Sequence, residues 1–142
     1  MTLHLIKLCV GVERIEELAQ WQKRRAAERK KNGGNGDVLH ITRMTPKRAD
    51  ELLAGGSLYW VIKGQIAVRQ RITALRPVTR DGVPHCALVL GRKLVPTVRR
   101  KHRAFQGWRY LDPKDAPRDL KLPDRSALPE KLRAQLTDLG LL

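Results

Sequence analysis

The chain has 142 residues and a formal net charge of +15, from 29 Lys and Arg against 14 Asp and Glu. This length favours a single domain. The two cysteines, Cys9 and Cys86, exclude a disulfide framework, and no run of residues approaches the roughly 18 apolar positions of a membrane span. We therefore expect a cytoplasmic protein with reduced thiols, without a secretory signal and without a membrane partner.

The basic excess is concentrated in the middle of the chain. Residues 38–111 hold 15 basic and three acidic residues, a net charge of +12, whereas residues 1–37 have a net charge of +3 and residues 112–142 of zero. A basic excess confined to one segment is typical of a nucleic-acid footprint.

The first elements alternate between strand and helix. Residues Thr2–Cys9 alternate as a strand does, and residues 12–30 carry the narrow apolar stripe of an amphipathic helix. The sequence NGGNGD at 32–37 is expected to be a flexible connector, and a second strand is expected at Val38–Met44.

A short helix is expected at Pro46–Ala54. Thr45 has the chemistry of an N-cap, Pro46 suits the first helical position, and the pair Gly55-Gly56 ends the helix. Further strands follow at Leu58–Ile62, Ile66–Leu75, Val83–Leu90, Lys93–Arg99 and Phe105–Leu111.

The first two of these strands would form a hairpin with one apolar and one basic face. A three-residue turn, Lys63-Gly64-Gln65, places Ile62 opposite Ile66 and Trp60 opposite Val68. All the large apolar side chains would then share the inner face. A two-residue turn would instead expose Trp60 with its neighbour Leu58, at a cost of several kcal/mol if apolar burial is worth ~25 cal/mol per Å2, so we favour the longer turn.

The opposite face of this hairpin would be basic and aromatic, with Tyr59 beside Arg69. A second run, RRKHRAFQGWRYL at 99–111, places five cationic or His residues directly before Phe105, Trp108 and Tyr110. Cations neutralise phosphates, and aromatic rings stack on unpaired bases at roughly 1–3 kcal/mol per base.

We therefore predict that the protein binds nucleic acid, in the form of RNA or a modified nucleotide, through these two runs. The residues predicted to make the contacts are Arg43, Lys47, Tyr59, Lys63, Arg69, Arg71, Arg103, Trp108, Arg109 and Tyr110. The basic end of the first helix, residues 23–31, either joins them or is a solvated face.

Other chemistry has weaker support in the sequence. The four histidines show no metal-ligand spacing, and His85 and Cys86 would point to opposite faces of a strand, so we expect neither a metal nor another cofactor. No Ser-His-Asp or Cys-His set is apparent, and catalysis is not the favoured reading. A nucleophilic Lys63 is the remaining option if that side chain is partly buried.

Three phrases of the sequence, MTLHLIKLCVGV, RMTPKRADELLAGGSLYWVIKG and FQGWRYLDPKDAP, resemble a bacterial family known as a domain of unknown function of about this length. The resemblance spans essentially the whole chain. It implies a shared fold and carries no activity to transfer.

Residues 45–78 also resemble, in pattern, the PUA-like group with its ASCH and EVE domains. That resemblance implies a small mixed barrel that binds RNA or modified nucleotides. Some ASCH members are amidohydrolases that use a lysine, a threonine and a glutamate. Lys63 stands where the lysine would, but residues 65–71 lack a threonine and residues 81–109 lack a glutamate, so no catalytic set is carried over.

We expect an α+β fold, a mostly antiparallel curved sheet or a small PUA-like barrel with helices packed at its edges. Residues 1–111 would form the core, and residues 112–142 a Pro-rich strap with a final helix at Pro129–Leu139, packed on the same domain. Two rival functions remain. One is a small ASCH-like enzyme acting on an anionic small molecule with Lys63 in a pocket beneath helix 45–54. The other is an adaptor that binds an acidic or ribosome-associated protein.

Overall fold

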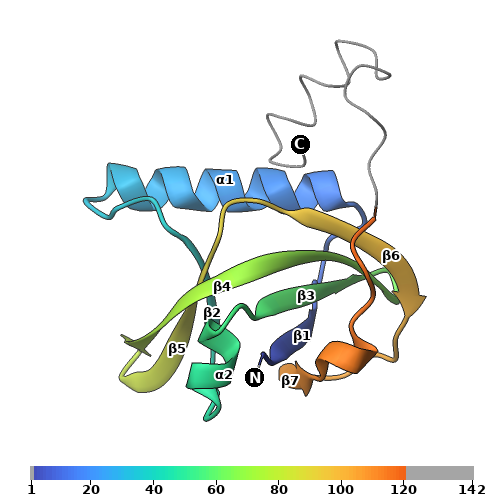
Figure 1. Cartoon of the computed structure of the whole chain (residues 1–142). Coiled ribbons are helices and arrows are strands. Elements are labelled where there is room, and N and C mark those ends of the chain that lie inside the picture. Colours follow the sequence, from blue (N-terminus) through green and yellow to red (C-terminus); the bar gives the residue numbers. More distant parts are fainter. Residues whose placement is uncertain (1, 121–142) are drawn as a thin grey trace.

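A curved seven-stranded sheet organises residues 2–120, the part of the chain that the computed structural model describes (Figure 1). Its strands are β1 (His4–Leu8), β2 (Val38–Thr42), β3 (Ser57–Ile62), β4 (Gln65–Arg80), β5 (Val83–Leu90), β6 (Val95–Lys101) and β7 (Trp108–Leu111). The order is β2-β5-β4-β3-β1-β7, with β6 also paired to β4, and of these pairings β1–β3 alone is parallel. The expected α+β class and the mostly antiparallel curved sheet are confirmed. The sheet is open, so the barrel alternative is wrong.

Two helices accompany the sheet. α1 (Ile15–Lys31) lies across it, and the short α2 (Ala49–Leu53) precedes β3 (Figure 1). Glu16 and Glu17 in the first turn and three basic residues in the last turn of α1 complement the helix dipole. No helix within residues 2–120 is long and apolar enough to cross a membrane.

The β3–β4 hairpin differs from the expected one at its turn. Lys63 and Gly64 form a two-residue loop with φ of 52° and 74°, the positive values that a tight hairpin turn with the twist of its strands requires. Ile62 consequently pairs with Gln65, and Val61 with Ile66. The three-residue turn is therefore wrong, and Ile66 packs on the opposite face from the one expected.

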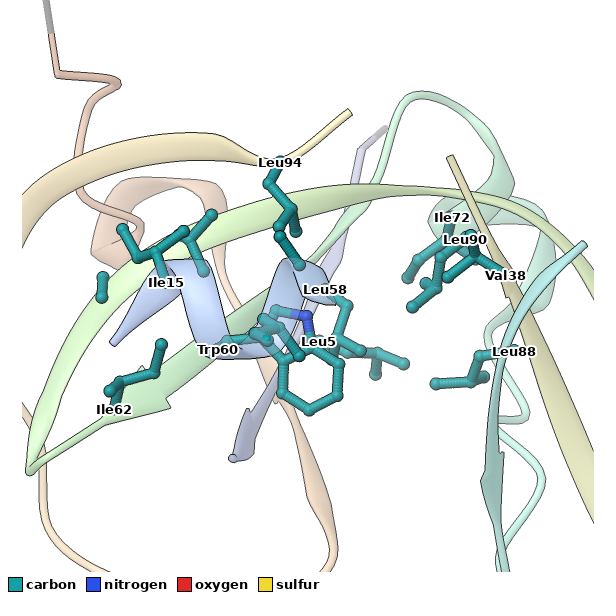
Figure 2. Close-up of a cluster of buried hydrophobic side chains, with 14 of the residues drawn as sticks. Leu5, Ile15, Val38, Leu58, Trp60, Ile62, Ile72, Leu88, Leu90 and Leu94 are labelled. Carbon is teal, nitrogen blue, oxygen red and sulfur yellow. The ribbon is translucent and has the colours of Figure 1, made fainter. Parts of the chain in front are cut away.

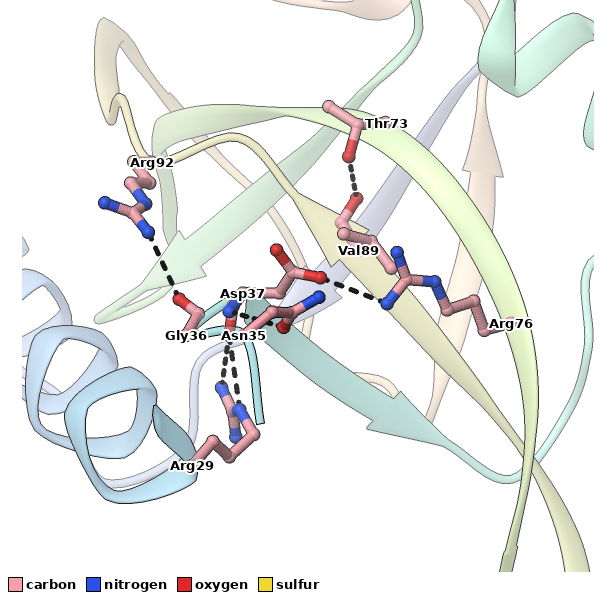
Figure 3. Close-up of polar contacts among 8 residues, drawn as sticks. All are labelled: Arg29, Asn35, Gly36, Asp37, Thr73, Arg76, Val89 and Arg92. Carbon is pink, nitrogen blue, oxygen red and sulfur yellow. Dashed lines mark hydrogen bonds and ion pairs between the residues drawn. The ribbon is translucent and has the colours of Figure 1, made fainter. Parts of the chain in front are cut away.

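A β-bulge one step further along the hairpin restores the expected pairing between β3 and β4. The register shifts between Trp60 and Val61, leaving Ala67 of β4 without a partner in β3, and Trp60 then pairs with Val68 and Tyr59 with Arg69. The expected inner-face positions of Trp60 and Val68 are thus reached by a shorter turn plus a bulge. A second bulge, at Thr73, is supported by its hydroxyl, which donates to the Val89 carbonyl at 3.1 Å (Figure 3).

The main core fills the space between α1 and the sheet. Side chains from α1, β1, β3, β4 and β5 converge around Trp60, which is 2% exposed (Figure 2). The largest buried apolar residues of this core are Leu5, Leu18, Leu52, Leu58, Trp60, Ile62, Ile72, Leu88 and Leu94. A smaller cluster, Ile6, Tyr59, Val61, Ile66 and Leu111, covers the other face of the same strands. Both faces of β1 and β3 are therefore buried.

A polar network is enclosed within the main core. Gln70 and Gln22 exchange amide hydrogen bonds of 2.8 and 2.7 Å, joining β4 to α1. Trp60 Nε1 donates to Gln70 Oε1 at 2.9 Å, and Gln70 Nε2 donates to the Gly91 carbonyl at 3.0 Å. Gln70 is fully buried, so each of its polar atoms needs a hydrogen-bond partner. Because only one placement of α1 on the sheet supplies these partners, the bonds fix the position of α1.

The two edges of the sheet are bridged by aromatic side chains. Trp108 Nε1 of β7 donates to the carbonyl of Met44, just beyond β2, at 2.9 Å. The hydroxyl of Tyr110 accepts hydrogen bonds from the backbone N–H groups of Lys47 and Arg48 at 3.0 and 3.2 Å. These contacts hold the edges together where a closed barrel would have a ladder of strand pairs.

This bridge explains why α2 is shorter than the helix expected at Pro46–Ala54. α2 begins at Ala49, with Arg48 at the N-cap, and Thr45 makes no capping bond. The two N–H groups that precede the helix are bonded to Tyr110 instead. The predicted cap at Thr45 is therefore wrong.

The connector at 32–37 is held by three arginines (Figure 3). Arg29 donates two hydrogen bonds to the Asp37 carbonyl at 3.2 and 3.0 Å, and Arg76 pairs with the Asp37 carboxylate at 3.0 Å. Arg92 donates to the Gly36 carbonyl at 3.5 Å. Part of the basic excess of the chain therefore serves the fold.

Residues 112–120 run along β6. Val98 and Leu120 donate backbone hydrogen bonds of 2.9 Å to Arg118 and Pro96, and a single 3-10 turn occupies Pro113–Asp115. The expected final helix, Pro129–Leu139, lies outside the described residues, and the division into a core at 1–111 and a strap at 112–142 stays a prediction.

His40 of β2 lies in the interior against Trp60, edge to face, with ring centroids 5.0 Å apart. Burial, aided by the nearby charge of Lys7, lowers the pKa of His40 from 6.5 to about 4. The imidazole is therefore neutral in the folded protein at neutral pH.

Lowering the pH from 6.5 to about 4 is expected to reduce the free energy of unfolding by up to about 3 kcal/mol through His40. In this window the unfolded chain binds a proton that the folded protein does not, so the stability is complete above pH 6.5 and is lost as the pH falls. His40→Gln removes this titration. Urea denaturation of both proteins across this range measures the difference, and parallel pH profiles would contradict a buried neutral His40.

Candidate nucleic-acid interface

The ten residues predicted to contact nucleic acid do not form one surface. They fall into three groups: the outer side of β3 and β4, the seam between the sheet edges, and the turn of the β3–β4 hairpin beside the loop before β7. The three groups differ in how exposed their side chains are and in how many of them already have partners within the protein.

On the outer side of β4, Arg69 is already neutralised. It makes two hydrogen bonds of 2.7 Å to the carboxylate of Asp119 and a third, at 3.2 Å, to Ser57 Oγ. The hydrogen bonds from Arg69 hold the pKa of Asp119 below its usual range, and the same pair raises the pKa of Arg69. Arg71, two residues further on, is exposed and forms no ion pair with any residue of 2–120.

Tyr59 is the clearest correction to the predicted contacts. Its side chain is 5% exposed and belongs to the smaller core cluster, where it meets His4 edge to face at 5.0 Å. Burial raises the pKa of its hydroxyl. The ring has no free face on which a base could stack, because both sides of β3 are covered.

At the seam, Trp108 and Tyr110 are half-buried and pack against the main core. Their polar atoms are used in bridging the sheet edges. Arg43 and Lys47 lie on the segment that crosses this seam, and both are exposed. The exposed cations of the seam can therefore contact a ligand, whereas its two aromatic side chains are occupied by contacts within the protein.

The third group brings together predicted and unpredicted residues in two adjoining depressions. The first, of about 480 Å3, is lined by Lys63, Gly64, Gln65, Lys101, His102 and Arg103. The second, of about 430 Å3, is lined by Lys101, His102, Arg103, Ala104, Phe105 and Arg109. Because they share three residues, we treat them as one feature, the basic hollow, defined by Lys63, Gln65, Lys101, His102, Arg103, Phe105 and Arg109.

Strand pairing creates the basic hollow. β6 pairs with the start of β4, so Lys101 lies opposite Gln65, and the His102 backbone N–H donates to the Gly64 carbonyl at 2.9 Å. The run of cations at the end of β6 is thereby held against the two-residue turn that carries Lys63.

Phe105 forms the aromatic part of the hollow. Its ring meets His102 edge to face at 5.1 Å, and the Arg109 guanidinium lies over it at 5.2 Å. Such a cation–ring contact orients a guanidinium without neutralising it.

The electrostatics of the hollow are one-sided. Four cationic side chains line it, and among residues 2–120 no carboxylate does. The nearest compensation is an exposed ion pair of 3.7 Å between Lys63 and Glu13, a kind of contact that contributes little in solvent. The hollow is therefore suited to an anionic ligand.

Of the ten predicted residues, the hollow contains Lys63, Arg103 and Arg109. Lys101, His102 and Phe105 were part of the noted basic-aromatic run but not of the predicted site. The sequence shows the basic-aromatic run to which these three residues belong. It does not show that β6 pairs with β4, which is what brings the run next to Lys63.

The rival site, with Lys63 in a pocket beneath residues 45–54, does not match the geometry. α2 precedes the start of β3, whereas Lys63 follows its end, and Lys63 is 65% exposed. No residue of 45–54 lines the depression at Lys63. Within residues 2–120, no group of three His, Cys, Asp or Glu side chains is placed to hold a metal ion.

Comparison with known proteins gives a family and no activity. No curated protein and no solved structure matches the chain. One family model, described as a protein of unknown function (DUF1489), matches residues 5–142. The match covers nearly the whole chain and agrees with the resemblance noted in its sequence phrases, and the chain belongs to the DUF1489 family.

Proposed function

We propose that the protein binds single-stranded RNA through the basic hollow. The observation that carries this proposal is the convergence of Lys63, Lys101, Arg103 and Arg109 around Phe105 with no acidic residue in the lining.

The chemistry of the hollow suits an unpaired strand. The four cationic groups of Lys63, Lys101, Arg103 and Arg109 neutralise phosphates, and the flat guanidinium planes of the two arginines also offer surfaces on which bases stack. Depressions of about 480 and 430 Å3 admit an unpaired base, whereas an A-form duplex keeps its bases out of reach of side chains. Arg71, Arg43 and Lys47 would add further phosphate contacts outside the hollow.

Reversing two charges in the hollow is expected to weaken RNA binding by more than about tenfold. The variant is Lys101→Glu/Arg103→Glu, which removes two phosphate contacts and adds repulsion. Fluorescence anisotropy with a labelled single-stranded RNA of about twelve nucleotides measures the dissociation constant.

The matched control is Lys30→Glu/Arg80→Glu, which changes the net charge equally at exposed positions on α1 and on the β4–β5 hairpin. We expect this control to weaken binding by less than about threefold. Equal losses in the two variants would mean that only the total charge matters, and would refute the hollow as the site.

A further inference from the structure

A second cavity, separate from the basic hollow, lies between the first turns of α1 and the end of β1. Its volume is about 560 Å3, within the range of small-molecule sites, and it shares no residue with the hollow. The loop that joins β1 to α1 forms one wall, and His40 and Trp60 line it from the sheet. We refer to it as the α1 cavity.

The walls of the α1 cavity are predominantly apolar. Trp21 and Trp60 contribute aromatic surface, and Leu8, Val12 and Leu18 contribute aliphatic surface. Such walls favour a ligand with a flat apolar body.

Two polar groups at the α1 cavity lack partners that the fold would normally provide. His40 Nε2 is, among residues 2–120, the one buried side-chain nitrogen or oxygen without a hydrogen bond. Leaving such an atom unpaired is destabilising, and a native fold rarely keeps one without a reason. Lys7 is half-buried, and no carboxylate of the described residues pairs with it.

The charge around the cavity favours an anion. Lys7 and Arg24 line it against the single carboxylate of Glu17. Burial lowers the pKa of Lys7, which reflects the cost of a charged ammonium without a counter-ion. An anionic group beside Lys7 would supply that counter-ion.

We propose that the α1 cavity binds a small molecule that joins a flat aromatic body to a single anionic group, with Lys7 as the partner of the anion and the tryptophans against the ring. His40 lines the same cavity, and its imidazole is neutral at neutral pH because burial lowers its pKa to about 4, so it adds no charge to the wall. This site is independent of RNA binding.

The test uses 2-naphthoate as the aromatic anion and 2-naphthamide as its neutral counterpart, with binding measured by isothermal titration calorimetry on the full chain. We expect the anion to bind about tenfold more tightly than the amide, because a hydrogen bond to a charged group is the stronger kind. Lys7→Met should remove this preference, and the exposed Lys47→Met control should keep it.

A second measurement locates the bound ligand in the wild-type protein, so it does not depend on whether a variant folds. Cys9 lines the cavity, whereas Cys86 does not. Burial raises the pKa of the Cys9 thiol to about 11, so alkylation by iodoacetamide is followed at about pH 9, where more of the reactive thiolate is present. Bound 2-naphthoate should slow alkylation of Cys9 in the wild-type protein, as measured by peptide mass spectrometry, and leave the slow reaction of the buried Cys86 unchanged.

Three results would overturn the proposal: no binding of 2-naphthoate, equal binding of acid and amide, or no protection of Cys9. The Lys101→Glu/Arg103→Glu variant should bind 2-naphthoate as the wild type does. Loss of 2-naphthoate binding in that variant would place the anion in the basic hollow instead of the α1 cavity.

Discussion

Gly56→Ala is expected to cost at least about 4 kcal/mol of folding free energy, a large part of the roughly 5–15 kcal/mol by which a native domain is stable. A methyl group on Gly56 would overlap the backbone carbonyl oxygens of Leu3 and Leu52. Neither oxygen belongs to a flexible side chain. Gly56 N–H donates to Leu52 at 2.8 Å and the Gly56 carbonyl accepts from Ile72 at 3.0 Å, so the segment cannot move aside without breaking the junction of α2 with β3 and β4.

Gly91→Ala is the matched control. A methyl group there would meet the Cβ of Arg71 at 3.5 Å, an ordinary van der Waals contact, and the backbone bonds of Gly91 would remain. We expect a change within about 1 kcal/mol. Thermal and urea denaturation followed by circular dichroism compare the two variants, and a Gly56→Ala protein as stable as Gly91→Ala would contradict the close packing at this junction.

Gln70→Leu is expected to cost about 4 kcal/mol, although it replaces a polar residue in a core with an apolar one. The substitution removes four hydrogen bonds and leaves the Gln22 amide, Trp60 Nε1 and the Gly91 carbonyl without partners in a buried environment. The penalty comes from these orphaned groups, because desolvation of each is no longer offset.

A double-mutant cycle separates this explanation from lost packing. Gln22→Leu/Gln70→Leu removes both members of the reciprocal pair, so the double variant should be at least about 1 kcal/mol more stable than the sum of the two single losses predicts. Urea denaturation of the four proteins gives the coupling energy. Additive losses would show that the two glutamines do not act as a pair.

Much of the fold follows from local sequence patterns. The strand at Val83–Leu90 was expected with the bounds that β5 has, and most other elements differ only at their ends. The β3–β4 turn was missed for a definable reason. The length of a turn sets which side chains share a face only in a hairpin without a bulge, and here a single unpaired residue, Ala67, restores the pairing of Trp60 with Val68 that a two-residue turn alone would not give. Nothing in the local pattern marks Ala67 as a bulge.

The candidate site was harder to predict because its groups come from distant segments. Alternation with Trp60 predicts Tyr59 to be a surface ring, but it is buried because Phe105, Leu111 and Ala116 belong to or pack against the cluster on that face. Thr45 looked like a cap and was displaced by Tyr110, 65 positions away in the sequence. The α1 cavity is likewise lined by residues from the range 7–24 together with His40 and Trp60. Because these come from separate segments, no local motif predicts the cavity.

The central claim, RNA binding by the basic hollow, is tested most directly by the salt dependence of the affinity. The four cations of the hollow alone predict a log–log slope of the association constant against salt concentration of about −3 for the wild type, measured between roughly 50 and 200 mM, and contacts from Arg43, Lys47 and Arg71 make it steeper. The slope should become shallower by about one unit or more in Lys101→Glu/Arg103→Glu, because two phosphate contacts are lost. A slope near zero in the wild type, or one that the variant leaves unchanged, would contradict the proposed function.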